Sequence, residues 1–147
     1  MQNLPHHYKA TAQGLLEGSI EISGSQLESI KTAAPAEFGG PGDQWSPETL
    51  FVAAIADCFI LTFRAISRAS KLPWISLSCE VEGTLERVDH VTQFTDYVVR
   101  AALVIAPDAD QSRAEQLLEK AERGCLISNS LSGTTRLEAS ISVVGSE

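Results

Sequence analysis

The sequence predicts an α+β fold in which antiparallel sheets pack around one long, central, buried helix. Two observations support this. Segments that alternate between apolar and polar residues flank a segment that is apolar at helical spacing, and hairpin turns rather than βαβ units separate the predicted strands. At 147 residues the chain is long enough to bury one core, so we expect a single domain over residues 1–147.

The first 45 residues predict short strands followed by a loop. Residues 8–12 and 18–22 alternate between apolar and polar side chains, which is typical of a hairpin broken near Gly14. We expect a third short strand to hold Leu27 and Ile30. The glycines and proline within residues 38–43 favour a mobile loop.

Residues 46–69 predict the central helix. Ser46 is a favourable N-cap, Pro47 suits the first helical position, and Glu48 lies beside the positive end of the helix dipole. The segment is apolar around nearly its whole circumference, unlike a surface helix with one apolar stripe. Since one sheet can cover only one side of this helix, we expect a second subunit, related by two-fold symmetry, on the other side.

The second half of the chain predicts two long strands, a helix and a last strand. Residues 75–85 alternate so that Cys79 points into the core, and a turn at Asp89 and His90 leads to a strand that includes residues 97–105. Asp108 is predicted to cap a helix that is closed by Gly124. Beyond the following loop, the last strand is expected over residues 137–143.

Composition excludes several classes of function. With 11 Lys and Arg against 19 Asp and Glu the formal net charge is -8, so a nucleic-acid backbone would be repelled. The N-terminus lacks the apolar region of a signal peptide, and the longest apolar run, residues 50–63, is interrupted by Asp57. We therefore expect a cytoplasmic protein that binds neither nucleic acid nor membrane.

The three cysteines indicate catalysis or core packing rather than a disulfide framework, because the cytosol keeps ordinary thiols reduced. A free cysteine is often a small buried hydrophobe, and this interpretation suits Cys79 on its inward strand face. No Cys-x-x-Cys pair occurs and the histidines lack ligand spacing to the cysteines, so we predict no metal site.

Two segments resemble a known family, the osmotically inducible protein C and organic hydroperoxide resistance (OsmC/Ohr) proteins. Residues 45–59, Trp-Ser-Pro-Glu-Thr-Leu-Phe-Val-Ala-Ala-Ile-Ala-Asp-Cys-Phe, are similar to that family's Asn-Pro-Glu-x-Leu-x-x-Ala-x-x-Ala-Cys-Phe signature. Residues 125–131, Cys-Leu-Ile-Ser-Asn-Ser-Leu, resemble its Cys-Pro-x-Ser-Asn-x-Leu segment. With matching elements between the two motifs, the resemblance covers most of the chain and implies the OsmC-like fold.

The resemblance also implies a peroxidase that uses two cysteines. Cys58 would attack an organic hydroperoxide and become a sulfenic acid, and Cys125 would condense with it to form a disulfide. Glu48 would belong to the same active site. No bound cofactor is implied. An external dithiol, in this family typically dihydrolipoamide attached to a protein, would restore both thiols.

The residue pattern supports part of this mechanism. Four apolar side chains on the central helix could line a pocket that favours organic hydroperoxides over hydrogen peroxide, and the same pattern would also suit a plain core. They are Phe51, Ile55, Phe59 and Phe63. An activating cation is harder to find, because relatives pair an arginine from the first hairpin or the loop with the glutamate, and this chain has no arginine before Arg64.

The missing arginine leaves two functions open. The first is the reduction of organic hydroperoxides with a dithiol as the reductant. The second is a slow redox-sensing module, or one that binds a lipophilic ligand, on the same fold. Near the expected position of the arginine the hairpin offers only Lys9 and the adjacent His6 and His7 as cations.

Glu48 predicts a composite site. It precedes Cys58 by ten residues on one predicted helix, which corresponds to a rise of about 15 Å and an angular offset of roughly 80°. A carboxylate cannot cross that distance. We therefore expect an intertwined homodimer in which each site takes Cys58 and Cys125 from one chain and Glu48 from the other.

Overall fold

The computed structural model describes residues 1–145 and confirms the α+β class, with two sheets and one long helix. The chain divides into two compact units, Met1–Leu50 and Phe51–Glu147, and each unit contains one three-stranded sheet. The expectation of a single domain over residues 1–147 stays a prediction.

The first unit holds the short strands that alternation predicts. β1 (Thr11–Gln13), β2 (Ile20–Ser23) and β3 (Ile30–Thr32) form an antiparallel sheet in chain order. Ile30 lies in β3 as expected, but Leu27 does not. The Leu27 amide donates a hydrogen bond to the Gly24 carbonyl at 3.2 Å, so Leu27 belongs to the turn between β2 and β3.

The glycine-rich loop contains a defined turn. A 3₁₀ helix, η1 (Ala36–Phe38), ends at Gly39, whose φ of 85° lies in the left-handed region that favours glycine. A Cβ atom on Gly40 would collide with the carbonyl oxygen of Ala34. These two glycines therefore allow the chain to turn sharply before it enters the long helix.

The long helix α1 (Pro47–Ser70) begins where the capping residues predict. The Ser46 hydroxyl accepts a hydrogen bond from the Thr49 amide at 3.1 Å, and the Ser46 amide donates to the Thr49 hydroxyl at 2.9 Å. This reciprocal arrangement is that of a capping box, with threonine in place of the usual glutamate or glutamine. The helix is continuous, so Glu48 and Cys58 lie about 15 Å apart along its axis.

The second sheet is built on a long hairpin of β4 (Trp74–Val88) and β5 (Val91–Ile105). Asp89 and His90 join the strands with φ values of 50° and 68°, as a two-residue turn of type I′ requires. The register shifts at two places, and at the first of them Ile75 has no partner and is 57% exposed, whereas strict alternation predicted an inward side chain.

The next helix, α2 (Gln111–Gly124), starts two residues later than predicted. Its cap is Asp110, whose Oδ1 accepts hydrogen bonds from the amides of Ser112 and Arg113 at 3.0 and 3.2 Å. Asp108 instead lies in the turn that precedes this cap.

The last strand corrects the predicted sheet. β6 (Thr134–Val143) follows a short helix, α3 (Leu126–Asn129), and pairs with β5 in a parallel direction. The sequence predicted antiparallel sheets, which holds for β4 and β5 but not for β6. The crossover through α2 and α3 returns the chain to the starting end of β5, and a strand that begins there must run parallel.

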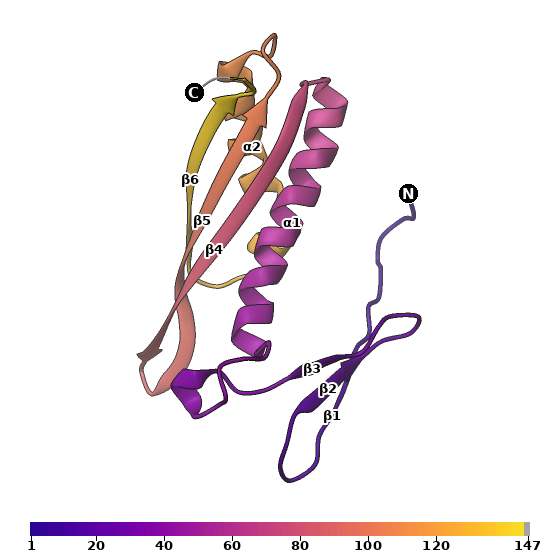
Figure 1. Cartoon of the computed structure of the whole chain (residues 1–147), viewed down its shortest axis with the longest axis vertical. Coiled ribbons are helices and arrows are strands. Elements are labelled where there is room, and N and C mark those ends of the chain that lie inside the picture. Colours follow the sequence, from indigo (N-terminus) through magenta and orange to yellow (C-terminus); the bar gives the residue numbers. More distant parts are fainter. Residues whose placement is uncertain (146–147) are drawn as a thin grey trace. The chain divides into compact units, whose positions relative to one another are not determined.

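The core of the second unit lies between this sheet and its helices, with α1 beside the hairpin (Figure 1). The inward residues of β5 are buried as predicted, and they are Tyr97, Val99, Ala101, Leu103 and Ile105. They belong to one hydrophobic cluster with buried residues of α1 and α2. The core thus fixes the inner faces of both helices against the sheet.

Only one stripe of α1 is buried in the single chain, although we expected the whole helix to be covered. The stripe repeats every four residues and comprises Ile55, Phe59, Phe63 and Ser67. Phe51, one turn before Ile55 in the same row, is 41% exposed, and Leu61, on another face, is 51% exposed. The remaining apolar surface of α1 is left exposed in the single chain, and the second subunit expected there stays a prediction.

The length and composition of α1 would also allow it to cross a membrane, a test that core helices of soluble proteins pass equally. Its exposed residues include Asp57, Arg64 and Arg68. Charged side chains are costly inside a bilayer. These charges argue against a membrane span by α1.

Candidate functional site

The candidate site is built around two thiols that the fold brings together. Cys58 lies in the middle of α1 and is partly exposed. Cys125 is fully buried between the end of α2 and the start of α3. A hydrogen bond joins the two side chains, and both cysteines are reduced. The structure thus places side by side two cysteines that are 67 positions apart in the sequence.

The surroundings of Cys58 favour its thiolate. Burial opposes ionisation, but hydrogen bonds from the Ile127 backbone, the Cys125 thiol, the Thr62 hydroxyl and the Leu126 backbone outweigh it and lower the pKa of the Cys58 thiol. Groups that donate hydrogen bonds to a charged form stabilise that form. Cys58 is consequently suited to act as a nucleophile at neutral pH.

The surroundings of Cys125 shift its pKa in the opposite direction. Burial raises the pKa of its thiol, and hydrogen bonds from Ser128 only partly offset this effect. The neighbouring Cys58 raises the pKa of Cys125 further, because two adjacent thiolates would repel each other. Of the two thiols, Cys58 is therefore the one that loses its proton more readily.

Cys79 packs against the core from the inner face of β4, as its position in the alternating strand predicts. Burial, with a smaller contribution from the charge of Cys125, raises the pKa of the Cys79 thiol to about 11. At neutral pH Cys79 is protonated and chemically inert.

An apolar cavity of about 510 Å³ lies between α1, β5 and the α3 region, and its lining includes neighbours of Cys58. Phe51 and Phe94 stack in one of its walls with ring centroids 5.2 Å apart and an interplanar angle of 4°, and Tyr97 lies against both rings. Two other lining residues connect the cavity to the thiol: Ala54 lies one turn before Cys58 on α1, and Ile127 contributes a hydrogen bond to it.

The four apolar residues predicted to line a substrate pocket separate into two groups. Phe51 lines the cavity. Ile55, Phe59 and Phe63 are at most 1% exposed and belong to the core cluster. They follow one another at intervals of four residues and pack in the core, so in this structure they do not line the cavity.

The Glu48 carboxylate has an unusual environment. Its Oε1 atom is buried and has no hydrogen-bond partner within residues 1–145. A buried carboxylate oxygen without a partner is unfavourable, and native proteins rarely leave one unpaired. The sequence-based role of Glu48 in the site stays a prediction, but this oxygen is a position where a partner group is missing.

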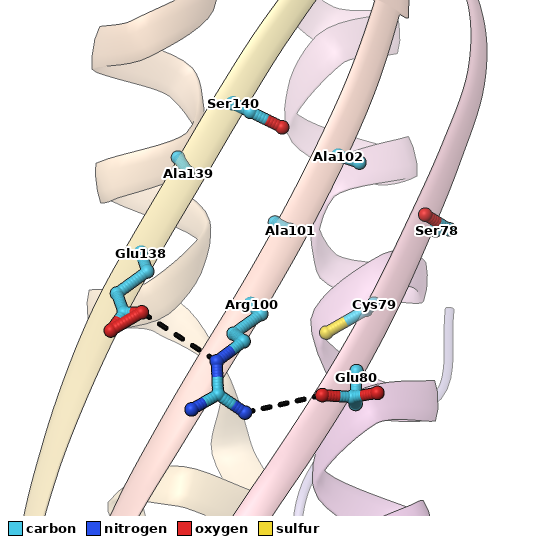
Figure 2. A pocket seen from close by; sticks show the side chains of 9 residues that line it. All are labelled: Ser78, Cys79, Glu80, Arg100, Ala101, Ala102, Glu138, Ala139 and Ser140. Atoms are coloured by element: carbon cyan, nitrogen blue, oxygen red, sulfur yellow. Dashed lines mark hydrogen bonds and ion pairs between the residues drawn. The ribbon is translucent and has the colours of Figure 1, made fainter.

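Another hollow lies on the outer face of the second sheet, where Arg100 projects between Glu80 and Glu138 (Figure 2). Arg100 forms ion pairs with Glu80 at 3.1 Å, Glu82 at 2.8 Å and Glu138 at 3.6 Å. The strand neighbours Val99 and Ala101 are buried, so Arg100 points away from the core and the thiols. Its charge is satisfied within the sheet, and such exposed pairs contribute little stability.

Sequence reasoning did not single out several residues of this site. Ile127 and Phe94 come from segments distant from α1, and no local pattern relates them to Cys58. Thr62 could have been found, because residues four positions apart share a helix face and Thr62 follows Cys58 at that spacing.

Comparison with known proteins places these features in context. The family model for OsmC-like proteins matches residues 40–140. The chain is 33% identical over 129 residues to the Bacillus subtilis protein YmaD, covering 86% of this chain and 84% of that relative. It is 32% identical over 126 residues to an organic hydroperoxide resistance protein of Xanthomonas axonopodis pathovar citri, covering 84% and 85% of the two chains.

A solved structure shows a similar fold. The crystal structure of an organic hydroperoxide resistance protein, OsmC, from Legionella pneumophila matches with a TM-score of 0.74 and 28% sequence identity. The match covers 95% of this chain and 99% of that one. Both sheets and the long helix are therefore features that this chain shares with a solved protein.

Proposed function

The chain belongs to the OsmC-like protein family, and from that premise we propose that it is a two-cysteine peroxidase that reduces organic hydroperoxides to alcohols in the cytoplasm. One observation carries the proposal: Cys58 and Cys125 are hydrogen-bonded beside an apolar cavity, with the pKa of Cys58 lowered and that of Cys125 raised. This is the division of labour that an attacking and a resolving thiol need.

In the first step the Cys58 thiolate attacks the terminal oxygen of the hydroperoxide. The O–O bond breaks, Cys58 becomes a sulfenic acid, and the alkoxide that leaves takes up a proton to become the alcohol. The substrate is reduced by two electrons, which come from the Cys58 sulfur. Leu126 and Ile127 backbone groups already contact that sulfur and would hold it in place during the attack.

In the second step Cys125 resolves the sulfenic acid. Its sulfur attacks the Cys58 sulfur, a disulfide forms, and the hydroxyl of the sulfenic acid leaves as water with the Cys125 proton. The two side chains are in contact before the reaction, so little movement is needed. An external dithiol, which we propose to be dihydrolipoamide attached to a protein, then reduces the disulfide and returns both thiols. No bound cofactor is required.

The cavity supports the choice of organic hydroperoxides. Its walls are mainly apolar, and the stacked rings of Phe51 and Phe94 offer a flat surface to an alkyl or aryl group. Hydrogen peroxide has no apolar part and would gain nothing from this surface. Binding of the organic group near Ala54 and Ile127 would direct its peroxide group toward Cys58.

We further propose that the active form is an intertwined homodimer with two composite sites. The apolar surface of α1 that the single chain leaves exposed is suited to a second copy. Glu48 lies about 15 Å from its own Cys58 along the helix, and its unpartnered Oε1 supports a role toward another chain. Each site would then combine Cys58 and Cys125 of one protomer with Glu48 of its partner.

The proposal is tested with single cysteine variants. Peroxide consumption is measured with dihydrolipoamide as the reductant and cumene hydroperoxide or hydrogen peroxide as the substrate. Cys58→Ser should abolish turnover, whereas Cys125→Ser should accumulate a Cys58 sulfenic acid that mass spectrometry detects after trapping with dimedone. Cumene hydroperoxide should be the better substrate of the two.

The same assay separates the alternative function. A sensing or ligand-binding module would show oxidation of Cys58 without sustained turnover, and wild type and Cys58→Ser would then consume peroxide equally slowly. Equal rates of peroxide consumption in those two proteins would contradict the peroxidase and favour the sensing module. Preference for hydrogen peroxide would instead contradict the role of the apolar cavity.

A further inference from the structure

The stabilisation of the Cys58 thiolate requires an explanation, because this chain lacks an arginine before Arg64. The structure supplies uncharged groups instead. Besides the backbone of Leu126 and Ile127, one side-chain hydroxyl lies at the sulfur: Thr62 Oγ1 is 3.9 Å from Cys58 Sγ. That separation is within the range of a hydrogen bond to sulfur, whose radius exceeds that of oxygen.

We propose that Thr62 is a further catalytic residue, whose hydroxyl donates a hydrogen bond to the reacting sulfur of Cys58 and takes the place of a cation. The inference rests on the proposed function, because it concerns the same thiol. Thr62 follows Cys58 by four residues in α1, so the two side chains lie on one helix face.

The hydroxyl of Thr62 is directed to the sulfur and not to the helix backbone. Other hydroxyls at helical positions bond to a carbonyl oxygen: Thr49 to Ser46 at 3.1 Å and Ser67 to Arg64 at 3.2 Å. This is the usual choice for serine and threonine in a helix. Within residues 1–145 the hydrogen bond of the Thr62 hydroxyl is the one to Cys58 Sγ.

The methyl group of Thr62 lies on the side of the end of α2. A side-chain carbon placed on Gly124 would lie 3.7 Å from Thr62 Cγ2, which shows that the methyl faces the end of α2. A β-branched side chain in a helix has few χ1 rotamers. With the methyl against Gly124, the hydroxyl occupies the other branch and points toward Cys58.

The titratable group that faces Cys58 is Cys125, which keeps its own proton, and Cys79 lies beyond Cys125. The influences on the Cys58 thiol are thus burial and uncharged hydrogen-bond donors. A hydrogen bond to an ionised group is stronger than one to a neutral group, so the Thr62 hydroxyl favours the thiolate. Salt screens exposed charges but leaves such a donor in place.

The test compares Thr62→Val, which keeps the shape and removes the hydroxyl, with Thr62→Ser, which keeps the hydroxyl. In the full-length protein, iodoacetamide labelling of the Cys58 peptide is followed by mass spectrometry across a pH series. Thr62→Val should shift the labelling midpoint to higher pH and slow labelling at pH 7 by roughly three- to tenfold. Thr62→Ser should stay within about twofold of wild type, and so should the exposed control Thr84→Val.

A labelling midpoint in Thr62→Val equal to that of wild type would overturn the inference. A wild-type midpoint that rises strongly in 1 M salt would also overturn it, since it would show that a cation holds the thiolate. Labelling does not depend on peroxide turnover. If neither wild type nor the Thr62 variants reduce peroxide but Thr62→Val still raises the pH of the labelling midpoint, the proposed function fails and the role of Thr62 remains.

Discussion

Cys58 and Cys79 show how two environments within one unit of the chain give the same side chain opposite chemistry. Both thiols are partly exposed, so exposure does not distinguish them. Cys58 lies where α1 meets the start of α3 and receives hydrogen bonds from the backbone and from Thr62, and its pKa is lowered. Cys79 lies on a strand face against the core, and burial raises its pKa to about 11.

The comparison teaches that hydrogen-bond donors decide whether burial prevails: they outweigh its effect on the pKa of Cys58, and at Cys79 burial acts without them. The N–H and C=O groups of β4 lie in the plane of the sheet, whereas the Cys79 side chain points to its inner face, and in the part of the chain that the structure describes no hydrogen bond contributes to the pKa of this thiol. The start of α3, in contrast, has amides without partners inside their own helix, and the Leu126 and Ile127 backbone groups hydrogen-bond to Cys58. A cysteine that faces the start of another helix, as Cys58 does, thus finds donors that Cys79 in the sheet lacks.

The largest expected effect is the difference in alkylation rate between these two cysteines. A pKa of about 11 for Cys79 is two units above the ordinary value of 9.0, whereas that of Cys58 is below it. The thiolate fractions at pH 7 should therefore differ by a factor on the order of a hundred or more. Peptide mapping after brief iodoacetamide treatment measures both rates. Similar rates at Cys58 and Cys79 would contradict the difference between their pKa values.

The contrast would be sharper if the Cys58 site also used a residue of a second chain, the Glu48 of its partner. Cys58→Ser and Glu48→Gln should each be nearly inactive, and equal mixing with subunit exchange should restore about a quarter of wild-type activity, because half of the dimers would hold one intact site. Gel filtration verifies exchange between differently tagged variants. Mixed dimers without activity would contradict the composite site.

The cavity beside Cys58 is the next difference from Cys79. Phe94→Ala removes one of the stacked rings, and we expect kcat/KM for cumene hydroperoxide to fall by roughly tenfold while the value for hydrogen peroxide changes little. Phe38→Ala, an exposed aromatic residue of the first unit, serves as the matched control. An equal loss for both peroxides would indicate a general defect and not substrate binding.

The smallest effect concerns stability at high pH. Because the pKa of Cys79 is raised in the folded state, its contribution to stability is complete below pH 9 and is lost as the pH rises toward 11. Cys79→Ala should reduce the alkaline loss of unfolding free energy by at most about 1 kcal/mol, since the group is partly exposed and screened. Urea unfolding at pH 8 and pH 10.5 measures the loss of unfolding free energy in each protein. Identical losses in wild type and Cys79→Ala would contradict the raised pKa of Cys79.

The sequence by itself determined the features that depend on neighbouring residues. Ser46 and Pro47 placed the start of α1, because capping is a local hydrogen-bond requirement. Alternation placed Cys79 and Tyr97 on inner faces, because successive side chains of a strand point to opposite sides. The two motifs around Cys58 and Cys125 identified the family for the same reason, since each is a short run of residues.

Only the tertiary structure decided which distant segments meet. The parallel pairing of β6, the position of Phe94 in the cavity and the hydrogen bond from Ile127 to Cys58 depend on how the crossover through α2 packs on the sheet. The burial of Phe59 in the core, with Phe51 at the cavity, depends on which face of a nearly uniform apolar helix meets that sheet. A pattern that is apolar all round does not specify the face, so packing made that choice.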